Sequence, residues 1–559
     1  MKRKKIIYIL ILILLVLFSF TFRFIPFIES DIRPYIWDSL SIINGSEAYI
    51  ETGSLQPDII QHSGYSPTEF SKRGPYYPLI QIGLAFIRSN LTKFGFSIQT
   101  YELVVFISLF LNILLILSSF FIFKEITENT NLSIIGVFFI SICLTITRDI
   151  IWCTIPSLLG YLIAFLIILG VIKYIKSKSI VWIVISILLF VSLSLIHLLT
   201  FSILLLSLVL FLILNNFKDL KFSRIILIFC ILIIGSTIFI SVYPEDTNLS
   251  FIDSFIFILY LGSSYFMQDS IVQNLQAPWN IPIFIGYVPF ILGILGLVSI
   301  RIKKIKLLLF SILFVAIVMG STYLIGFNYF GERIILYSWI PLYLSIPMGI
   351  KTFSHHLKVN NKLKFSSIII GLLLISSTLN AIVYQKNFYL THYSSIPSNN
   401  DIDAINWLIV NSQEEDVILT ISYWPYVSTK WIPVLTRKRT AFLNMDSINR
   451  HDSYSLSIVN PKGFIGVIAE KLANQQTKTR YEEWLVHRFK VGYGMMGYET
   501  YLMFKFPDCL ESKELINSYS IKYVYTYFNT PEDQAISESS NYILVFSNER
   551  VRIYERNIK

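Results

Sequence analysis

Long apolar runs, separated by short polar stretches, fill the first two thirds of the chain. A helix that crosses a bilayer core needs about 20 apolar residues, and about eleven segments of this sequence meet that requirement. They lie near residues 6–27, 101–123, 131–148, 151–173, 180–196, 197–214, 223–243, 281–300, 306–326, 333–351 and 365–385. The pattern predicts a polytopic α-helical membrane protein.

Two of these segments need a further argument. The apolar run over 180–214 is too long for one crossing, and we divide it at "SLSLIHLLT", where Ser194, His197 and Thr200 interrupt it. The first segment begins with basic residues, as a signal peptide does, but its apolar run is longer and no small-residue cleavage site follows. We therefore expect the first segment to remain as a membrane helix.

The basic residues between the apolar runs predict the orientation of the chain. If "KRKK" lies in the cytoplasm, the later segments "KYIKSKS", "NNFKDLKFSR", "RIKKIK" and "KTFSHHLKVNNKLK" fall on the same side, as the positive-inside rule requires. Two long loops, 28–100 and 244–280, then lie outside, and the second contains no Lys or Arg. The apolar piece at 76–87 is too short to span, and we expect an interfacial helix on the outer surface there.

The pattern changes after residue 396. "PSNNDIDAINWLIVNS" predicts a capped amphipathic helix, and "DVILTIS", "SIKYVYTYF", "NYILVFSN" and "RVRIYERN" predict strands. We therefore expect a membrane domain over 1–396 and an α/β domain over 397–559. An odd number of crossings places the second domain outside the cytoplasm, together with the first loop.

The composition agrees with the prediction of a membrane protein and argues against several classes of function. The sequence of 559 residues is 54% hydrophobic and only 15% charged, and its net charge of +10 comes from short basic groups between apolar runs. No basic stripe with interleaved aromatic residues is present, so we expect no nucleic-acid partner. Walker, GxSxG and HExxH motifs are absent from the sequence, which argues against an ATP-driven pump or a familiar hydrolase.

Charged residues near the predicted outer ends of the membrane helices are the candidates for function, because such charges tend to face cavities or partners. They are Asp31, Asp38, Arg148, Asp149, His197 and Arg333. Arg148 and Asp149 are sequence neighbours, so their side chains are expected to project differently and need not pair. Each candidate also has an ordinary explanation, as a solvated carboxylate, a headgroup anchor or, for the histidine, a kink in a helix.

These residues, in this order, resemble the GT-C class of membrane glycosyltransferases, which includes protein mannosyltransferases, aminoarabinose transferases and the catalytic subunits of oligosaccharyltransferases. The resemblance is carried by an acid after the first helix, Asp31, by "PYYPLIQIGLAFI", and by a second acid between the third and fourth helices, Asp149. It is also carried by Arg333 in "GERIILYSWIPLYLSIPMGI" and by "IHLLT".

The resemblance implies transfer of a sugar from a polyprenyl-phosphate donor to a protein, lipid or glycan acceptor on the extracytoplasmic face of the cell membrane. It makes Asp31 the base and Arg333 the residue that binds the lipid phosphate. The further residues expected at the substrates are Asp38, Lys72, Arg73, Arg148, Asp149 and His197. Metal-dependent members carry an acid-x-acid pair, but Arg33 stands two residues after Asp31, so Mg²⁺ or Mn²⁺ would need Asp31 and Asp149 from different loops.

Three other functions stay open at this point. A lipid-linked saccharide flippase would need polar residues at mid-bilayer and repeat symmetry. A glycan polymerase or ligase also joins lipid-linked sugars outside the cell. A membrane scaffold would use the outer domain to bind a partner.

Overall fold

The structure, a computed structural model, describes most of the predicted helices and strands. The described residues are 2–30, 32–34, 37–54, 78–215, 281–321, 331–356, 363–392, 396–413, 415–421, 431–436, 438–443, 471 and 495–557. The predicted crossing at 223–243 and the loop at 244–280 lie outside them. The chain forms two compact units. We call them the helical unit (1–26, 106–388 and 459–478) and the sheet unit (27–105, 389–458 and 479–559).

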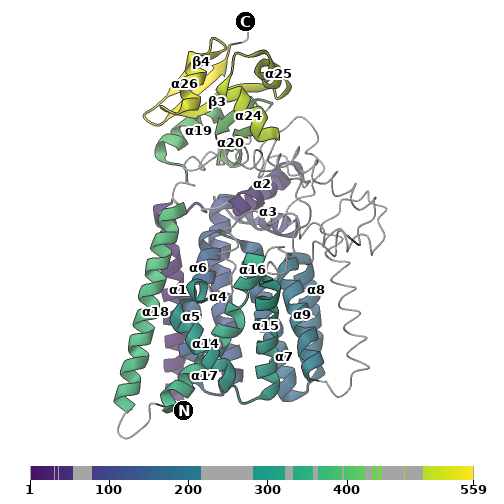
Figure 1. Cartoon of the computed structure of the whole chain (residues 1–559), viewed down its shortest axis with the longest axis vertical. Helices are drawn as coiled ribbons and strands as arrows, with labels where there is room; N and C mark the ends of the chain where they lie inside the picture. Colours follow the sequence, from purple (N-terminus) through teal and green to yellow (C-terminus); the bar gives the residue numbers. More distant parts are fainter. Residues whose placement is uncertain are drawn as a thin grey trace. The chain divides into compact units, whose positions relative to one another are not determined.

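The helical unit consists of helices that run alongside one another (Figure 1). It contains most of α1 (Lys2–Glu29), α4 (Thr100–Thr127) and α18 (Leu363–His392), together with α5 (Thr130–Ser141), α6 (Leu144–Ile151), α7 (Ile155–Ser177), α8 (Ile180–Ile196), α9 (Leu198–Asn215), α13 (Ile281–Ile285), α14 (Tyr287–Ser299), α15 (Lys303–Gly320), α16 (Gly331–Leu336) and α17 (Trp339–His356). Among the described residues, five helices are long and apolar enough to cross a membrane, or six if α5 and α6 count as one bent span.

Three predicted crossings are interrupted. The segment predicted as one helix over 131–148 is two helices, α5 and α6, which meet at an angle of 43°. The segment over 281–300 is broken at Gly286, whose φ of 94° lies in the left-handed region that glycine adopts without strain. The segment over 333–351 is divided between α16 and α17. The division of 180–214 at His197 is confirmed, because His197 caps the end of α8.

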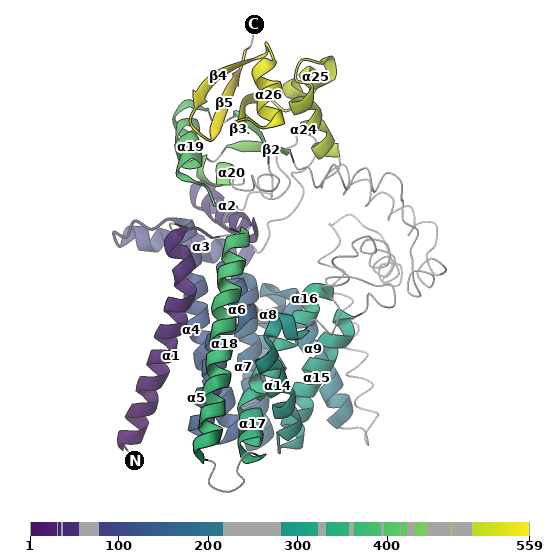
Figure 2. The ribbon, with the colours of Figure 1, turned by 60° about the vertical axis from the view of Figure 1, so that its left-hand side comes forward.

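Small residues bring α14 and α17 into close contact. A Cβ atom added to Gly296 would lie 1.8 Å from the carbonyl oxygen of Ser345, and one added to Gly349 would lie 2.0 Å from that of Leu292. Only glycine permits backbones to approach this closely, which is the way small residues pack helices in membranes. α14 and α17 therefore pack closely against each other within the helical unit (Figure 2).

The sheet unit combines the loop that follows α1 with the C-terminal domain. Its first part packs α2 (Trp37–Thr52) against α3 (Pro78–Lys93). α3 buries Ile80 and Leu84 but exposes Leu79 and Phe86, as expected of a helix that lies in a membrane surface. α2 contacts α20 (Trp431–Thr436), and the ring of Tyr101 meets that of Trp431 edge-on at 5.9 Å. The first loop and the C-terminal domain thus share one unit.

The C-terminal domain is built on a five-stranded sheet in the order β2-β1-β3-β5-β4. Its strands are β1 (Val417–Ile421), β2 (Arg439–Leu443), β3 (Ile521–Tyr527), β4 (Tyr542–Ser547) and β5 (Val551–Arg556). β1 pairs in parallel with β2 and β3, whereas β5 pairs antiparallel with β3 and β4. The four predicted strands are confirmed; β2 was not predicted.

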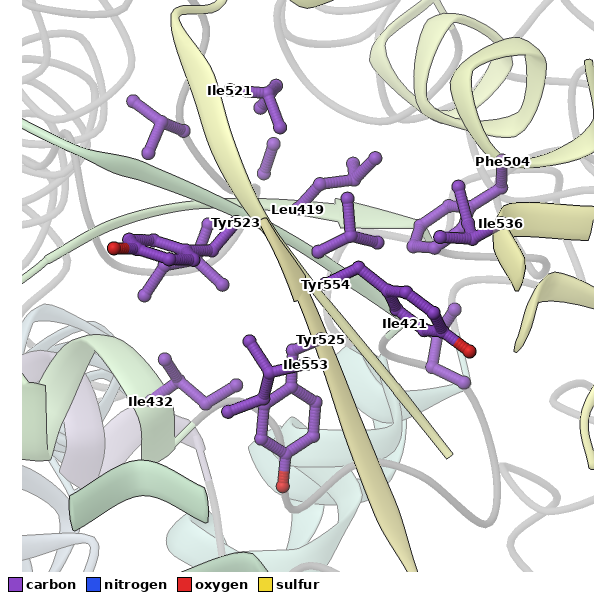
Figure 3. Close-up of a cluster of buried hydrophobic side chains, with 14 of the residues drawn as sticks. Leu419, Ile421, Ile432, Phe504, Ile521, Tyr523, Tyr525, Ile536, Ile553 and Tyr554 are labelled. Atoms are coloured by element: carbon purple, nitrogen blue, oxygen red, sulfur yellow. The ribbon is translucent and has the colours of Figure 1, made fainter. Parts of the chain in front are cut away.

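Helices and apolar side chains complete this domain. The predicted capped helix is α19 (Asn399–Asn411), where Ser398 and Asp401 form a capping box. The other helices are α24 (Met495–Lys505), α25 (Leu510–Ser518) and α26 (Pro531–Glu538). Figure 3 shows the core, in which Leu419, Tyr525 and Ile553 from the three central strands are buried together.

Candidate active site

The structure locates part of the predicted site. Asp31, Lys72 and Arg73 lie outside the described residues. Asp38 lies in the first turn of α2, and Arg333 lies in α16. The structure describes only the backbone of these two residues. Arg148, Asp149 and His197 are described with their side chains, and all three belong to the helical unit.

Arg148 and Asp149 form an ion pair at the end of α6. Nε and Nη2 of Arg148 both donate to Oδ1 of Asp149, at 2.9 and 2.7 Å. The expectation that these neighbours need not pair is wrong, because the long arginine side chain folds back along the last turn of a short helix. Its guanidinium carbon lies 5.0 Å from the ring centre of Trp152, a cation–π contact that fixes the same conformation.

The second carboxylate oxygen of Asp149 has no such partner. The Asp149 side chain is 3% exposed, and its Oδ2 is buried without a hydrogen bond among the described residues. A buried carboxylate oxygen without a partner is costly, so it requires a ligand or a functional explanation. This oxygen is the best-defined candidate for contact with a substrate in the described part of the helical unit.

The backbone after α6 is tightly turned. The carbonyl of Asp149 accepts bonds from the amide and the hydroxyl of Thr154, at 2.9 and 3.1 Å. Cys153 between them has a φ of 51°, in the left-handed region that costs a non-glycine residue about 1–3 kcal/mol. Such strain persists only where the surrounding contacts hold it, and here it lies beside the ion pair.

Aromatic residues surround the acid. The phenol of Tyr161 in α7 lies near enough to the Asp149 carboxylate for a weak hydrogen-bonding interaction, although Oδ2 has no partner at full hydrogen-bond geometry. The phenol of Tyr384 in α18 is close enough to interact with the charge of Asp149. The Tyr161 ring meets those of Tyr337 and Trp339 nearly edge-on, at 5.5 and 5.4 Å between centroids. Sequence reasoning missed these tyrosines, because their spacing resembles that of ordinary core positions.

His197 lies in a hydrogen-bonded chain that leads to the same aromatic residues. Its Nδ1 accepts from the Thr200 amide at 3.2 Å and lies 2.7 Å from the Thr200 hydroxyl. The hydroxyl lies 2.6 Å from that of Tyr337, and Nε2 lies 3.4 Å from the Ser157 hydroxyl. Because Nδ1 accepts from a backbone amide, this network assigns the proton of a neutral imidazole to Nε2. His197 thus ties the α8–α9 turn to Tyr337.

Sequence reasoning also missed Arg23 in α1. It is fully buried, and Nε donates to the Thr147 hydroxyl at 3.2 Å while Nη2 donates to the carbonyl of Ile140 at 3.1 Å. A charged residue inside an apolar run was the available signal, since such residues are costly in a membrane and usually have a specific partner.

The described residues do not fit a metal ion. In the described ranges, no group of three or more His, Cys, Asp or Glu residues could hold one. Oδ1 of Asp149 is already bound by Arg148, whose positive charge would repel a cation at the remaining oxygen. We derive no catalytic step through a metal.

The comparisons with known proteins agree with this architecture. The sequence matches no protein-family model and no curated protein. The structure resembles the Archaeoglobus fulgidus oligosaccharyltransferase in complex with Zn and sulfate, with a TM-score of 0.53 and 12% identity over 92% of this chain and 68% of that one. It also resembles ArnT from Cupriavidus metallidurans bound to undecaprenyl phosphate, with a TM-score of 0.50 and 9% identity over 97% of each chain.

Both structures are GT-C glycosyltransferases, so the chain has a fold similar to that of the GT-C class, as the order of residues along the sequence predicted. The helical unit and the C-terminal sheet are both parts of this likeness, since the match to ArnT extends over nearly the whole of both chains.

Proposed function

We propose that this protein is a membrane glycosyltransferase that moves a sugar from a polyprenyl-phosphate donor to an acceptor hydroxyl or amide on the extracytoplasmic face. The observation that carries the proposal is the end-to-end likeness to ArnT bound to undecaprenyl phosphate. The buried Asp149 oxygen supports it, because a carboxylate held at a helix end in a membrane unit is expected at a polar substrate.

The proposed reaction is a displacement at the anomeric carbon. Asp31 accepts the proton of the acceptor, the acceptor oxygen or nitrogen bonds to the anomeric carbon, and the bond from that carbon to the phosphate oxygen breaks. Polyprenyl phosphate leaves with the electron pair, and the configuration inverts. Positive charge stabilises the departing phosphate in such a step, and we assign that role to Arg333, with Arg73 and Arg148 as further candidates.

The contacts of Arg148 change the role that we expect of this residue. Its guanidinium is engaged by Asp149 and Trp152, so we assign Arg148 first to holding Asp149. Asp149 presents its free oxygen to the sugar or the acceptor, and His197 supports the neighbouring Tyr337 through Thr200. Asp38 in α2 remains a candidate for acceptor binding.

The proposed orientation has the N-terminus in the cytoplasm and the C-terminal domain outside. The contact between α2 and α20 supports the placement of the first loop and the C-terminal domain on one side of the membrane, because both belong to the sheet unit. We propose about eleven membrane-spanning segments, each of about 20 residues, which is the length needed to cross the hydrocarbon core.

Substitution of Arg333 tests the donor. We expect Arg333→Ala to raise the KM for an undecaprenyl-phosphate sugar about 10- to 100-fold, because a charged hydrogen bond to phosphate contributes about 1.5–3 kcal/mol. The assay follows release of undecaprenyl phosphate by the purified full chain in proteoliposomes, with a panel of undecaprenyl-phosphate hexoses and pentoses and a cell-envelope extract as acceptor. Arg301→Ala, at an exposed arginine, is the control. An unchanged KM would remove Arg333 from the donor site, and no release by the wild type from any donor would contradict the proposed function.

A further inference from the structure

The guanidinium of Arg23 joins α1 to three other helices inside the helical unit, α4, α5 and α6. It reaches from α1 to Asn112 in α4, through Nη1, and to the link between α5 and α6. The side chain is completely buried, and none of its partners in the described part of the chain is a carboxylate. A buried, unpaired positive charge is costly, so five neutral partners indicate a specific structural demand.

That demand comes from the break between α5 and α6. A helix that ends leaves its last carbonyl groups without intrahelical donors, and its C-terminal end carries a partial negative charge. Nη2 of Arg23 donates to the carbonyls of Ile140 and Cys143, at 3.1 and 3.4 Å, and Ser19 donates to the carbonyl of Ser141 at 3.2 Å. The carbonyls of Ile140 and Cys143 also accept from the amides of Cys143 and Thr147, at 3.2 and 2.9 Å, so Arg23 adds a second donor at each of them. Arg23 and Ser19 thus tie the backbone at the break to α1.

The same guanidinium also holds α6. Nε donates to Thr147, which lies two residues before Asp149 and donates in turn to the carbonyl of Cys143 at 2.9 Å. α6 has only eight residues, so fixing Thr147 and the link before it fixes the direction of the whole helix. The ion pair of Arg148 and Asp149 lies at the far end of this short helix.

We propose that Arg23 is a positioning residue that sets the angle of α6 against α5 and thereby places the free oxygen of Asp149. Only the expected effect on turnover rests on the proposed glycosyl transfer; the expected effect on the position of α6 does not. Lysine cannot replace the arginine fully, because a single ammonium lacks the planar set of donors that binds the carbonyls, Asn112 and Thr147 together.

Two variants and two readouts test the proposal. Arg23→Lys keeps the charge, and Thr147→Val removes, at nearly constant shape, the hydroxyl that accepts from Arg23 and donates to the carbonyl of Cys143. The matched control is Thr378→Val, whose hydroxyl donates to Leu374 within its own helix. The first readout is fluorotryptophan NMR of the full chain in detergent. The resonance of Trp152, beside Arg148, is assigned with Trp152→Phe, and that of Trp182 in α8 is assigned with Trp182→Phe.

We expect both variants to shift the Trp152 resonance and to leave that of Trp182 unchanged, whereas Thr378→Val shifts neither. The second readout is turnover of the undecaprenyl-phosphate sugar. We expect kcat to fall about 10- to 100-fold for Arg23→Lys and by less for Thr147→Val, while KM stays within about twofold of the wild type. The reason is that a displacement of the Asp149 carboxylate by about 1 Å lowers the rate of reaction more than it weakens binding.

An unchanged Trp152 resonance in Thr147→Val would overturn the positioning role, because it would show that α6 stays in place without the bond to Arg23. Equal shifts of the Trp152 and Trp182 resonances would also overturn it, because they would show a general loosening of the fold. The NMR readout needs no activity, so a wild type without turnover would contradict the proposed function and leave the positioning test intact.

Discussion

At the scale of single residues, the structure describes the side chains of three of the candidates, Arg148, Asp149 and His197, and pairs the first two. The sequence could place Arg148 and Asp149 near a helix end but not pair them, because the pairing depends on how far a side chain folds back and on Trp152. It could not identify Tyr384 either, since Asp149 lies on a helix far away in the sequence, nor Tyr161, whose position resembles an ordinary core position. Asp31, the predicted base, remains a prediction from order and resemblance.

Buried polar residues in the sheet unit allow a test by pH. The Tyr554 hydroxyl donates to Oδ1 of Asp533 at 2.8 Å, and burial, followed by this bond, raises the pKa of Tyr554 to about 12. Because the pKa of an unfolded tyrosine is about 10, its contribution to stability is complete below pH 10 and is lost as the pH rises through 12. The difference in tyrosinate absorbance between the wild type and Tyr554→Phe should titrate near pH 12. A midpoint near pH 10, with circular dichroism still that of the folded protein, would contradict the assignment.

At the scale of elements, periodicity and length predicted most helices and four of the five strands. Ile180–Ile196 and α19 begin and end close to the predicted bounds, because polar caps and interruptions mark them in the sequence. The break between α5 and α6 was missed, because apolar residues continue through it and the side chains that bond to the backbone there come from α1. β2 was missed because "RTAFL" is short and has no clear alternation.

The contact between α14 and α17 gives a prediction at this scale. Gly296→Ala should lower the free energy of unfolding by about 1–3 kcal/mol, because its Cβ would overlap the carbonyl of Ser345 and force the helices apart. The measurement is unfolding of the purified protein in mixed detergent micelles. Gly371→Ala in α18 is the matched control, since no atom lies within 4 Å of its added Cβ. Equal stability of the two variants would show that the backbones do not approach as described.

At the scale of the whole molecule, the order of the two acids, the short interfacial helix, the "IHLLT" step, the late arginine and the C-terminal domain predicted the class, although no single motif did. The reason is physical: identities of 9–12% leave few shared residues, but charged groups are costly along membrane helices, so their order along the chain is a stronger signal than any single residue. The sugar and the acceptor depend on side chains that this order does not specify.

The most direct test of the account is the rate at which the purified full chain releases undecaprenyl phosphate from an undecaprenyl-phosphate sugar in proteoliposomes, compared with Asp31→Asn. Loss of a general base removes about 10²–10⁴-fold in rate, so the variant should be slower by this factor while it still binds undecaprenyl phosphate. Glu29→Gln, at the end of α1, should behave as the wild type. Release by Asp31→Asn at nearly the wild-type rate would contradict the account.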